Sequence, residues 1–153
     1  MAGGDLVSVL GGVDLFRGLS PKVLGQIADH GHQADYAPGT KVIVQGDSVE
    51  GFKAFSPGGV EMHVVLGGSA RIDVHGETHT TLGPGTYFGE ISLIDGRPRS
   101  ADVVAGDEGL QTLALSKWTF DDLLEKHPEI AVPMLRVLAA RLRADEEPRA
   151  DAG

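Results

Sequence analysis

The middle of the chain, from about residue 36 to residue 115, is a series of short apolar runs separated by glycine-containing turns. In the run SARIDVHG, Ala70, Ile72 and Val74 alternate with polar residues, which is the period of a strand with one buried face. Many short strands of this kind bury their apolar faces against one another in a sandwich or a barrel. The sequence therefore predicts a mainly β fold.

Helical patterns flank this β-rich centre. SPKVLGQIADHG offers Ser20 as an N-cap ahead of Pro21, and SKWTFDDLLEKH offers Ser116 in the same role. We expect Trp118 and Phe120 to pack the second of these helices onto the sheet. The segment PEIAVPMLRVLAARLRADEE predicts a last helix with five apolar residues on one face: Ile130, Met134, Leu135, Leu138 and Leu142.

Length and composition narrow the class of protein. The 153 residues suit one domain, which we place at residues 1–147, with a disordered tail at 148–153. A net charge of −9 argues against the dense basic surface that wraps nucleic acid, and the absence of cysteine rules out disulfides and thiolate zinc sites. No apolar run approaches the ~18 residues of a transmembrane helix, and the first residues lack the basic region of a signal peptide. We expect a bacterial, cytoplasmic protein with neither nucleic acid nor membrane as a partner.

The stretch YFGEISLIDGRPRSADVVA carries the most specific chemistry. The residues EISLI can form one helical turn, whose first N–H groups, at Ile91 and Ser92, would point at a bound anion. Arg99 follows a short loop with a planar guanidinium that suits phosphate oxygens. A carboxylate beside a phosphate would repel it, so Glu90 is best explained if it accepts a hydrogen bond from a neighbouring hydroxyl, such as that of a ribose. The pattern indicates a nucleotide.

This stretch resembles the phosphate-binding cassette of cyclic nucleotide-binding domains, which occur in catabolite activator proteins, cyclic-nucleotide-dependent kinases and gated channels. The cassette has Phe-Gly-Glu, a short loop, and an arginine followed by a small residue and alanine, all present here. The segments DLFRGLSPKVLGQIA, YAPGTKVIVQGD, GGSARIDV and LSKWTFDDLLEKHPEI are similar to other parts of the family's domain. The resemblance implies an antiparallel, jelly-roll-like β-roll with N-terminal helices and C-terminal helices of the family's B and C type.

The resemblance also implies a role for each site residue. Glu90 would bind the ribose 2′-hydroxyl, and Arg99 would pair with the exocyclic phosphate oxygens. Gly89 and the backbone N–H groups of Ile91 and Ser92 would line the ribose and the cyclic phosphate. The remaining expected contacts surround the phosphate edge and the base: Ser100 on the phosphate or purine edge, Ala101 next to it, and Ile72 and Leu82 as apolar base contacts.

The function expected from these residues is regulatory and not enzymatic. We expect a stand-alone sensor that binds a 3′,5′-cyclic nucleotide, cAMP first and cGMP second, without a metal, and acts through a partner protein. The loop at residues 52–59 and the last helix are the expected partner surfaces. Two alternatives stay open: an adaptor of the same fold that binds no ligand, and a cupin-like metal-dependent enzyme. The cupin reading lacks the expected His-x-His followed by a glutamate, and His75 and His79 complete no metal set.

Overall fold

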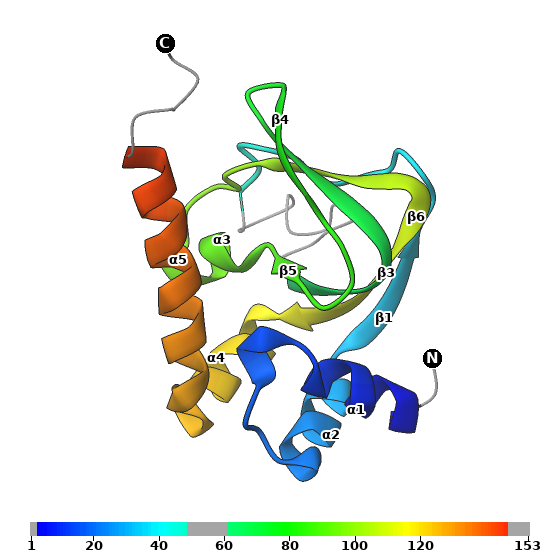
Figure 1. Cartoon of the computed structure of the whole chain (residues 1–153), viewed down its shortest axis with the longest axis vertical. Helices are drawn as coiled ribbons and strands as arrows, with labels where there is room; N and C mark the ends of the chain where they lie inside the picture. The colour runs from blue at the N-terminus through cyan, green and yellow to red at the C-terminus, as the bar shows by residue number, and fades with distance from the viewer. Residues whose placement is uncertain (1–2, 49–60, 147–153) are drawn as a thin grey trace.

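The computed structural model of the chain describes residues 3–48 and 61–146 (Figure 1). The segment 52–59 expected to meet a partner and the tail at 148–153 lie outside these residues. A rolled antiparallel sheet forms one end of the molecule, α1 and α2 lie at the other end, and α5 runs along one side. The mainly β fold with flanking helices is confirmed.

Two helices and a 3₁₀ turn precede the sheet: α1 (Gly3–Gly11), η1 (Asp14–Phe16) and α2 (Pro21–His30). The strands are β1 (His32–Tyr36), β2 (Lys41–Ile43), β3 (Glu61–Val74), β4 (Glu77–Leu82), β5 (Tyr87–Phe88) and β6 (Asp102–Ser116). The remaining helical elements are α3 (Glu90–Asp95), between β5 and β6, and then α4 (Lys117–Lys126), η3 (Pro128–Ile130) and α5 (Ala131–Glu146).

The two long strands β3 and β6 form the spine of the roll. They pair antiparallel from Glu61 opposite Ser116 to Asp73 opposite Asp102, with two register shifts that bend the ribbon. Gly68 lies between these shifts with a φ of 70°, and a Cβ atom there would lie 2.1 Å from the carbonyl oxygen of Gly109. Only glycine fits this close approach of the two strands.

The spine has a core on each of its faces. Met62 and Val64 pack toward the helices, in a cluster that includes Phe16, Phe120 and Ile130. Val65, of the opposite parity, faces the interior of the roll, and after the two register shifts Ala70 faces it as well. They pack there with six other buried residues: Val42, Ile43, Phe88, Val103, Ala105 and Leu110. The period-2 alternation of β3 thus separates a helix-facing core from a roll-interior core.

The predicted helix caps are confirmed. The Ser20 hydroxyl accepts a hydrogen bond from the Val23 N–H at 3.3 Å, and the Ser116 hydroxyl accepts one from the Thr119 N–H at 3.2 Å. Phe120 is buried as expected, but Trp118 is 88% exposed, so its predicted packing role is wrong. Trp118 is the second residue of α4, and two residues later the helix has turned by about 200°. Only the later of these two aromatic residues faces the core.

The last helix does not bury one single face as expected. Ile130 and Met134 are buried and Leu138 is half-buried, whereas Leu135 is 62% exposed and Leu142 is 58% exposed. Ile130 ends η3, and within α5 residue 138 is rotated by only about 40° from residue 134, whereas residues 135 and 142 are rotated by about 100° and about 80° in the same sense. Part of the apolar content of α5 therefore faces outward.

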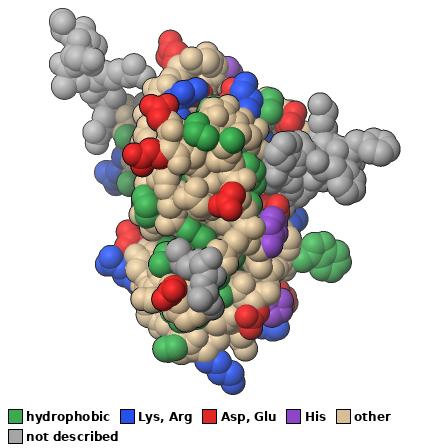
Figure 2. All heavy atoms as spheres, turned by 90° about the vertical axis from the view of Figure 1, so that its right-hand side faces the viewer, with side chains coloured by type: hydrophobic (Ala, Val, Ile, Leu, Met, Phe, Trp, Pro, Cys, Tyr) green, Lys and Arg blue, Asp and Glu red, His purple; other side chains and the backbone are tan. Residues whose placement is uncertain are grey.

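Charge is mixed over the surface. Figure 2 shows one face on which acidic and basic side chains are interspersed, with hydrophobic side chains singly or in small groups between them. Within residues 3–48 and 61–146, no helix is long and apolar enough to cross a bilayer.

Candidate ligand-binding site

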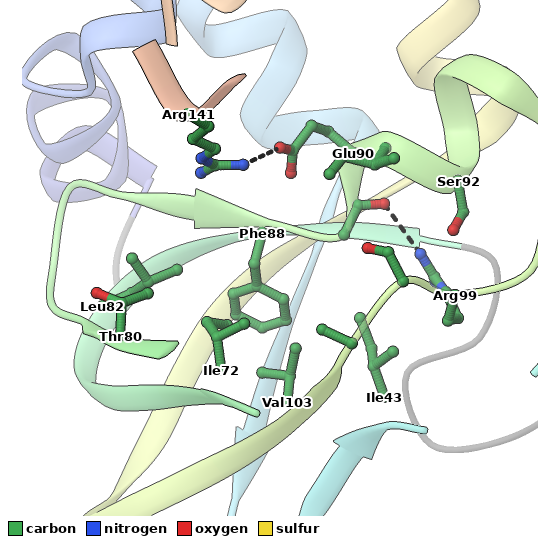
Figure 3. A pocket seen from close by; sticks show the side chains of 14 residues that line it. Ile43, Ile72, Thr80, Leu82, Phe88, Glu90, Ser92, Arg99, Val103 and Arg141 are labelled. Atoms are coloured by element: carbon green, nitrogen blue, oxygen red, sulfur yellow. Dashed lines mark hydrogen bonds and ion pairs between the residues drawn. The ribbon is translucent and has the colours of Figure 1, made fainter. Parts of the chain in front are cut away.

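A pocket opens between α3, the roll and α5 (Figure 3). All nine residues that the sequence singled out line it, while their contacts to a ligand remain predictions. Five further residues complete the lining, from strands β2, β4, β5 and β6 and from α5. The full lining is Ile43, Ile72, Thr80, Leu82, Phe88, Gly89, Glu90, Ile91, Ser92, Arg99, Ser100, Ala101, Val103 and Arg141.

The turn from β5 into α3 brings the Phe-Gly-Glu sequence to the pocket. Gly89 caps α3 with a φ of 86°, and a Cβ atom on it would lie 3.0 Å from the carbonyl oxygen of Glu61. A side chain is disfavoured here by both the backbone conformation and the space. The first N–H groups of a helix have no partner within it, and in α3 these include the N–H groups of Ile91 and Ser92. The turn thus presents backbone donors beside the Glu90 carboxylate.

Arg99 is held in a fixed orientation. Only 5% of the residue is exposed, and its Nη1 donates to the carbonyl oxygen of Gly89 at 2.9 Å (Figure 3). Its Nη2 donates to the carbonyl oxygen of Glu61 at 2.9 Å. Burial lowers the pKa of Arg99, while the carboxylates of Glu61, Glu90 and Asp47 act in the opposite direction. An arginine stays protonated in proteins, so this is a buried positive charge that lines the pocket.

Glu90 is the buried negative charge of the site. The residue is 2% exposed, and its Oε1 accepts a hydrogen bond from Nη1 of Arg141 on α5 at 3.0 Å (Figure 3). Burial, and secondly the charge of Glu90, raises the pKa of the neighbouring Tyr87 to about 12, and Arg141 acts in the opposite direction. The last helix therefore contributes directly to the site.

Sequence reasoning missed Arg141. A signal was available, because residues 134, 138 and 141 lie on one stripe of the helix, so a guanidinium continues the face that packs against the roll. A charged residue in such a stripe needs a buried partner, and Glu90 supplies it.

The other end of the pocket is apolar. Ile72 of β3 and Leu82 of β4 line it as expected, together with Val103 and the ring of Phe88 (Figure 3). Thr80, which the sequence analysis did not single out, lies opposite Ile72 in the β3–β4 register and adds a hydroxyl. The pocket therefore combines a charged end with an apolar end that carries one hydroxyl.

Comparison with known proteins identifies the family of this chain. The model of the family described as "Cyclic nucleotide-binding domain" matches residues 33–127. The chain belongs to this family. The expected family resemblance is confirmed, and the cyclic nucleotide-binding domain is a ligand-binding regulatory fold.

Relatives of this cyclic nucleotide-binding domain cover most of its length. The cyclic AMP receptor protein of Thermus thermophilus is 33% identical over 133 residues, which are 86% of this chain and 58% of that protein. The cAMP-dependent protein kinase regulatory subunit of Blastocladiella emersonii is 36% identical over 114 residues, 73% of this chain and 26% of that subunit. The crystal structure of the Thermus thermophilus catabolite activator protein superposes with a TM-score of 0.72 at 31% identity, over 87% of this chain and 60% of that one. The chain thus spans less than two thirds of each.

Metal chemistry finds no support in the part of the chain that the structure describes. There, no group of three or more His, Cys, Asp and Glu side chains could hold a metal ion. That the domain works without a metal and catalyses no reaction remains a prediction.

Proposed function

We propose that this domain binds a 3′,5′-cyclic nucleotide, cAMP first and cGMP second. One observation carries the proposal: Glu90 and Arg99, both almost completely buried, line the charged end of a pocket whose other end is apolar. A cyclic phosphate for Arg99, a ribose hydroxyl for Glu90 and a base for the apolar end match the three parts of the pocket.

The phosphate would lie between Arg99 and the N–H groups of α3. Because two backbone carbonyls already fix the guanidinium, little side-chain entropy is lost when the anion binds. A charge-assisted hydrogen bond is stronger than a neutral one, and the buried setting strengthens it further. The fixed arginine therefore supplies much of the affinity.

Glu90 would bind a hydroxyl of the ribose. A carboxylate has about four acceptor positions, so the bond from Arg141 to Oε1 leaves the group able to accept a ribose hydroxyl as well. Arg141 also offsets the negative charge that would otherwise repel the phosphate. The ion pair and the ligand thus act on the same carboxylate.

The output would pass through α5 to a partner protein. Arg141 connects this helix to Glu90, and a ligand shifts the position of the helix by its difference in affinity for the two positions. The exposed Leu135 and Leu142 give the partner an apolar surface on the same helix. We propose that the domain acts as a stand-alone sensor in this way, and that neither nucleic acid nor membrane is its direct partner.

Isothermal titration calorimetry with cAMP, cGMP and 5′-AMP tests the proposed ligand. We expect saturable binding of a cyclic nucleotide, no binding of 5′-AMP, and a loss of about 2–5 kcal/mol in Arg99→Ala, the usual cost of truncating one side of a buried charge pair. Arg97→Ala is the matched control, because Arg97 is an exposed arginine two residues earlier in the same loop.

Three outcomes contradict the proposal in different ways. An absence of heat with every nucleotide, together with an unchanged melting temperature, favours the adaptor alternative. Equal losses in Arg97→Ala and Arg99→Ala argue against the assigned phosphate site. A stoichiometric metal in the purified protein, found by elemental analysis, favours the cupin-like alternative.

A further inference from the structure

His63 lies at the centre of the roll, next to the ligand pocket. It is fully buried on β3, opposite Phe88 of β5 in the sheet register. Its imidazole stacks on the Phe88 ring with 5.0 Å between centroids and 13° between planes, and the Tyr36 ring makes an edge contact with it at 6.2 Å. Phe88 lines the pocket and His63 does not, so the imidazole supports a pocket residue without forming part of the lining.

A hydrogen bond ties this imidazole to the spine of the sheet. Its Nδ1 lies 3.0 Å from Oγ1 of Thr112, which is fully buried on β6. A buried polar group without a hydrogen bond is costly, so the Thr112 hydroxyl makes the imidazole tolerable at this position. The bond also fixes the plane of the ring relative to β6, one of the two longest strands.

The strand that carries Phe88 is short. β5 has two residues, and its described pairing consists of His63 with Phe88 and Val64 with Tyr87. Two backbone hydrogen bonds, from the Val65 N–H to the Thr86 carbonyl oxygen and from the Gly85 N–H to the Val65 carbonyl oxygen, fix the residues just before this strand. Phe88 is the last residue of the pairing, so the cross-strand contact of its side chain contributes to its placement. The stack on His63 is the contact of this kind that reaches a pocket residue.

The placement of Phe88 determines the charged end of the pocket. Gly89 follows directly, and its carbonyl oxygen accepts a hydrogen bond from Arg99. Glu90 comes next and begins α3. The strand β3 holds Arg99 a second time through the carbonyl oxygen of Glu61, two residues before His63. A small displacement of Phe88 would therefore change the distance between the carboxylate and the guanidinium.

We infer that His63 is a positioning residue for the ligand site. Its ring holds Phe88 and, through Phe88, the turn that presents Glu90 and the carbonyl oxygen that orients Arg99. The inference deepens the proposed function and rests on it for the identity of the ligand.

Two variants distinguish the contribution of the His63 ring from that of its hydrogen bond to Thr112. His63→Gln keeps a polar group that can bond to Thr112 and removes the ring. His63→Phe combined with Thr112→Val keeps an aromatic ring beside Phe88 and removes the hydrogen bond between positions 63 and 112. Ile27→Val is the matched control for a loss of core volume, because Ile27 is buried in the helix-facing core.

Titration of each 153-residue protein with cAMP gives the first readout. We expect His63→Gln to weaken binding about tenfold, which corresponds to the loss of one aromatic pair. The double variant should stay within about threefold of the wild type, since it conserves the apolar volume. Ile27→Val should bind as the wild type does. The inference is wrong if His63→Gln binds with unchanged affinity, or if the double variant loses as much as His63→Gln.

Amide hydrogen exchange of the ligand-free proteins gives a second readout that needs no nucleotide. We expect His63→Gln to accelerate exchange in residues 88–93 and to leave α2 unchanged. Equal exchange in the wild type and His63→Gln overturns the inference by itself. If the wild type binds neither cAMP nor cGMP, the proposed function fails, while the exchange comparison still decides whether His63 holds the turn.

Discussion

Arg141 and Glu90 are 51 residues apart in the chain, and their Nη1 and Oε1 atoms lie 3.0 Å apart. The glutamate is buried, whereas the side chain of the arginine is 46% exposed. The pair connects the last helix to the turn that forms the charged end of the pocket. Substitutions of this pair therefore test whether α5 contributes to ligand binding.

Removal of Arg141 should loosen this connection. In Arg141→Ala, the buried carboxylate of Glu90 loses a cation and repels the phosphate more strongly, so we expect the dissociation constant for cAMP to rise about tenfold. The free energy of unfolding should fall by only about 1 kcal/mol, because the partly exposed arginine is screened by solvent. Calorimetric titration and urea unfolding measure the two effects. Arg143→Ala, an exposed arginine on the same helix, is the control, and equal affinities of the two variants would show that the ion pair plays no part.

Substitution of Glu90 should change the recognition of the sugar more than that of the phosphate. We expect the wild type to bind cAMP more tightly than 2′-deoxy-cAMP. In Glu90→Gln the ratio of the two dissociation constants should be about tenfold smaller, because a hydrogen bond to a charged group becomes one to a neutral group. The measurement is the ratio of the two dissociation constants in each protein. A ratio near one in the wild type would contradict the proposed hydrogen bond between the ribose hydroxyl and Glu90.

The stability of the fold should fall in alkali through Tyr87. Burial raises the pKa of Tyr87 to about 12 from 10.0, so between these pH values the unfolded chain releases the phenolic proton and the folded chain keeps it. The contribution of Tyr87 is complete below pH 10 and is lost as the pH rises toward 12. We expect an additional loss of about 1 kcal/mol relative to Tyr87→Phe, since solvent screens part of the effect. Urea unfolding of both proteins from pH 9 to pH 11 measures it, and parallel pH profiles would contradict this assignment.

The two aromatic residues of α4 should differ sharply in their contribution to stability. Phe120→Ala removes a buried ring from the helix-facing core and should cost about 3–5 kcal/mol. Trp118→Ala removes an exposed side chain and should change the free energy of unfolding by less than about 0.5 kcal/mol. Circular dichroism during urea unfolding reports both values without relying on tryptophan fluorescence. A large loss in Trp118→Ala would mean that α4 packs in a different orientation.

The sequence predicted the parts of the site that lie close together in the chain. Glu90, Ile91, Ser92 and Arg99 fall within ten residues, and a carboxylate, the first N–H groups of a helix and a guanidinium each have a distinct preference for an anion or a hydroxyl. The strand period of residues 70–74 and the two serine caps could be predicted for the same reason, because local geometry determines them.

The contributions that depend on tertiary packing could not be predicted in the same way. The stripe of residues 134, 138 and 141 indicates that Arg141 faces the roll, but Glu90 becomes its partner only because η3 and α5 fold back along the roll. Trp118 and Leu135 were assigned to the core because they are apolar, although the rotation of each helix decides which apolar residue faces inward. His63 could not be distinguished from the exposed histidines, since its burial results from pairing with strands distant in the sequence.

The two faces of α5 set the distance over which the proposed output would have to pass through this helix. One face brings Arg141 into the pocket, and another carries Leu135 and Leu142 on the surface. An α-helix with its side chains is about 10 Å across. A partner that contacts the outer face would therefore detect nucleotide occupancy across the thickness of one helix, with no need for a rearrangement of the roll.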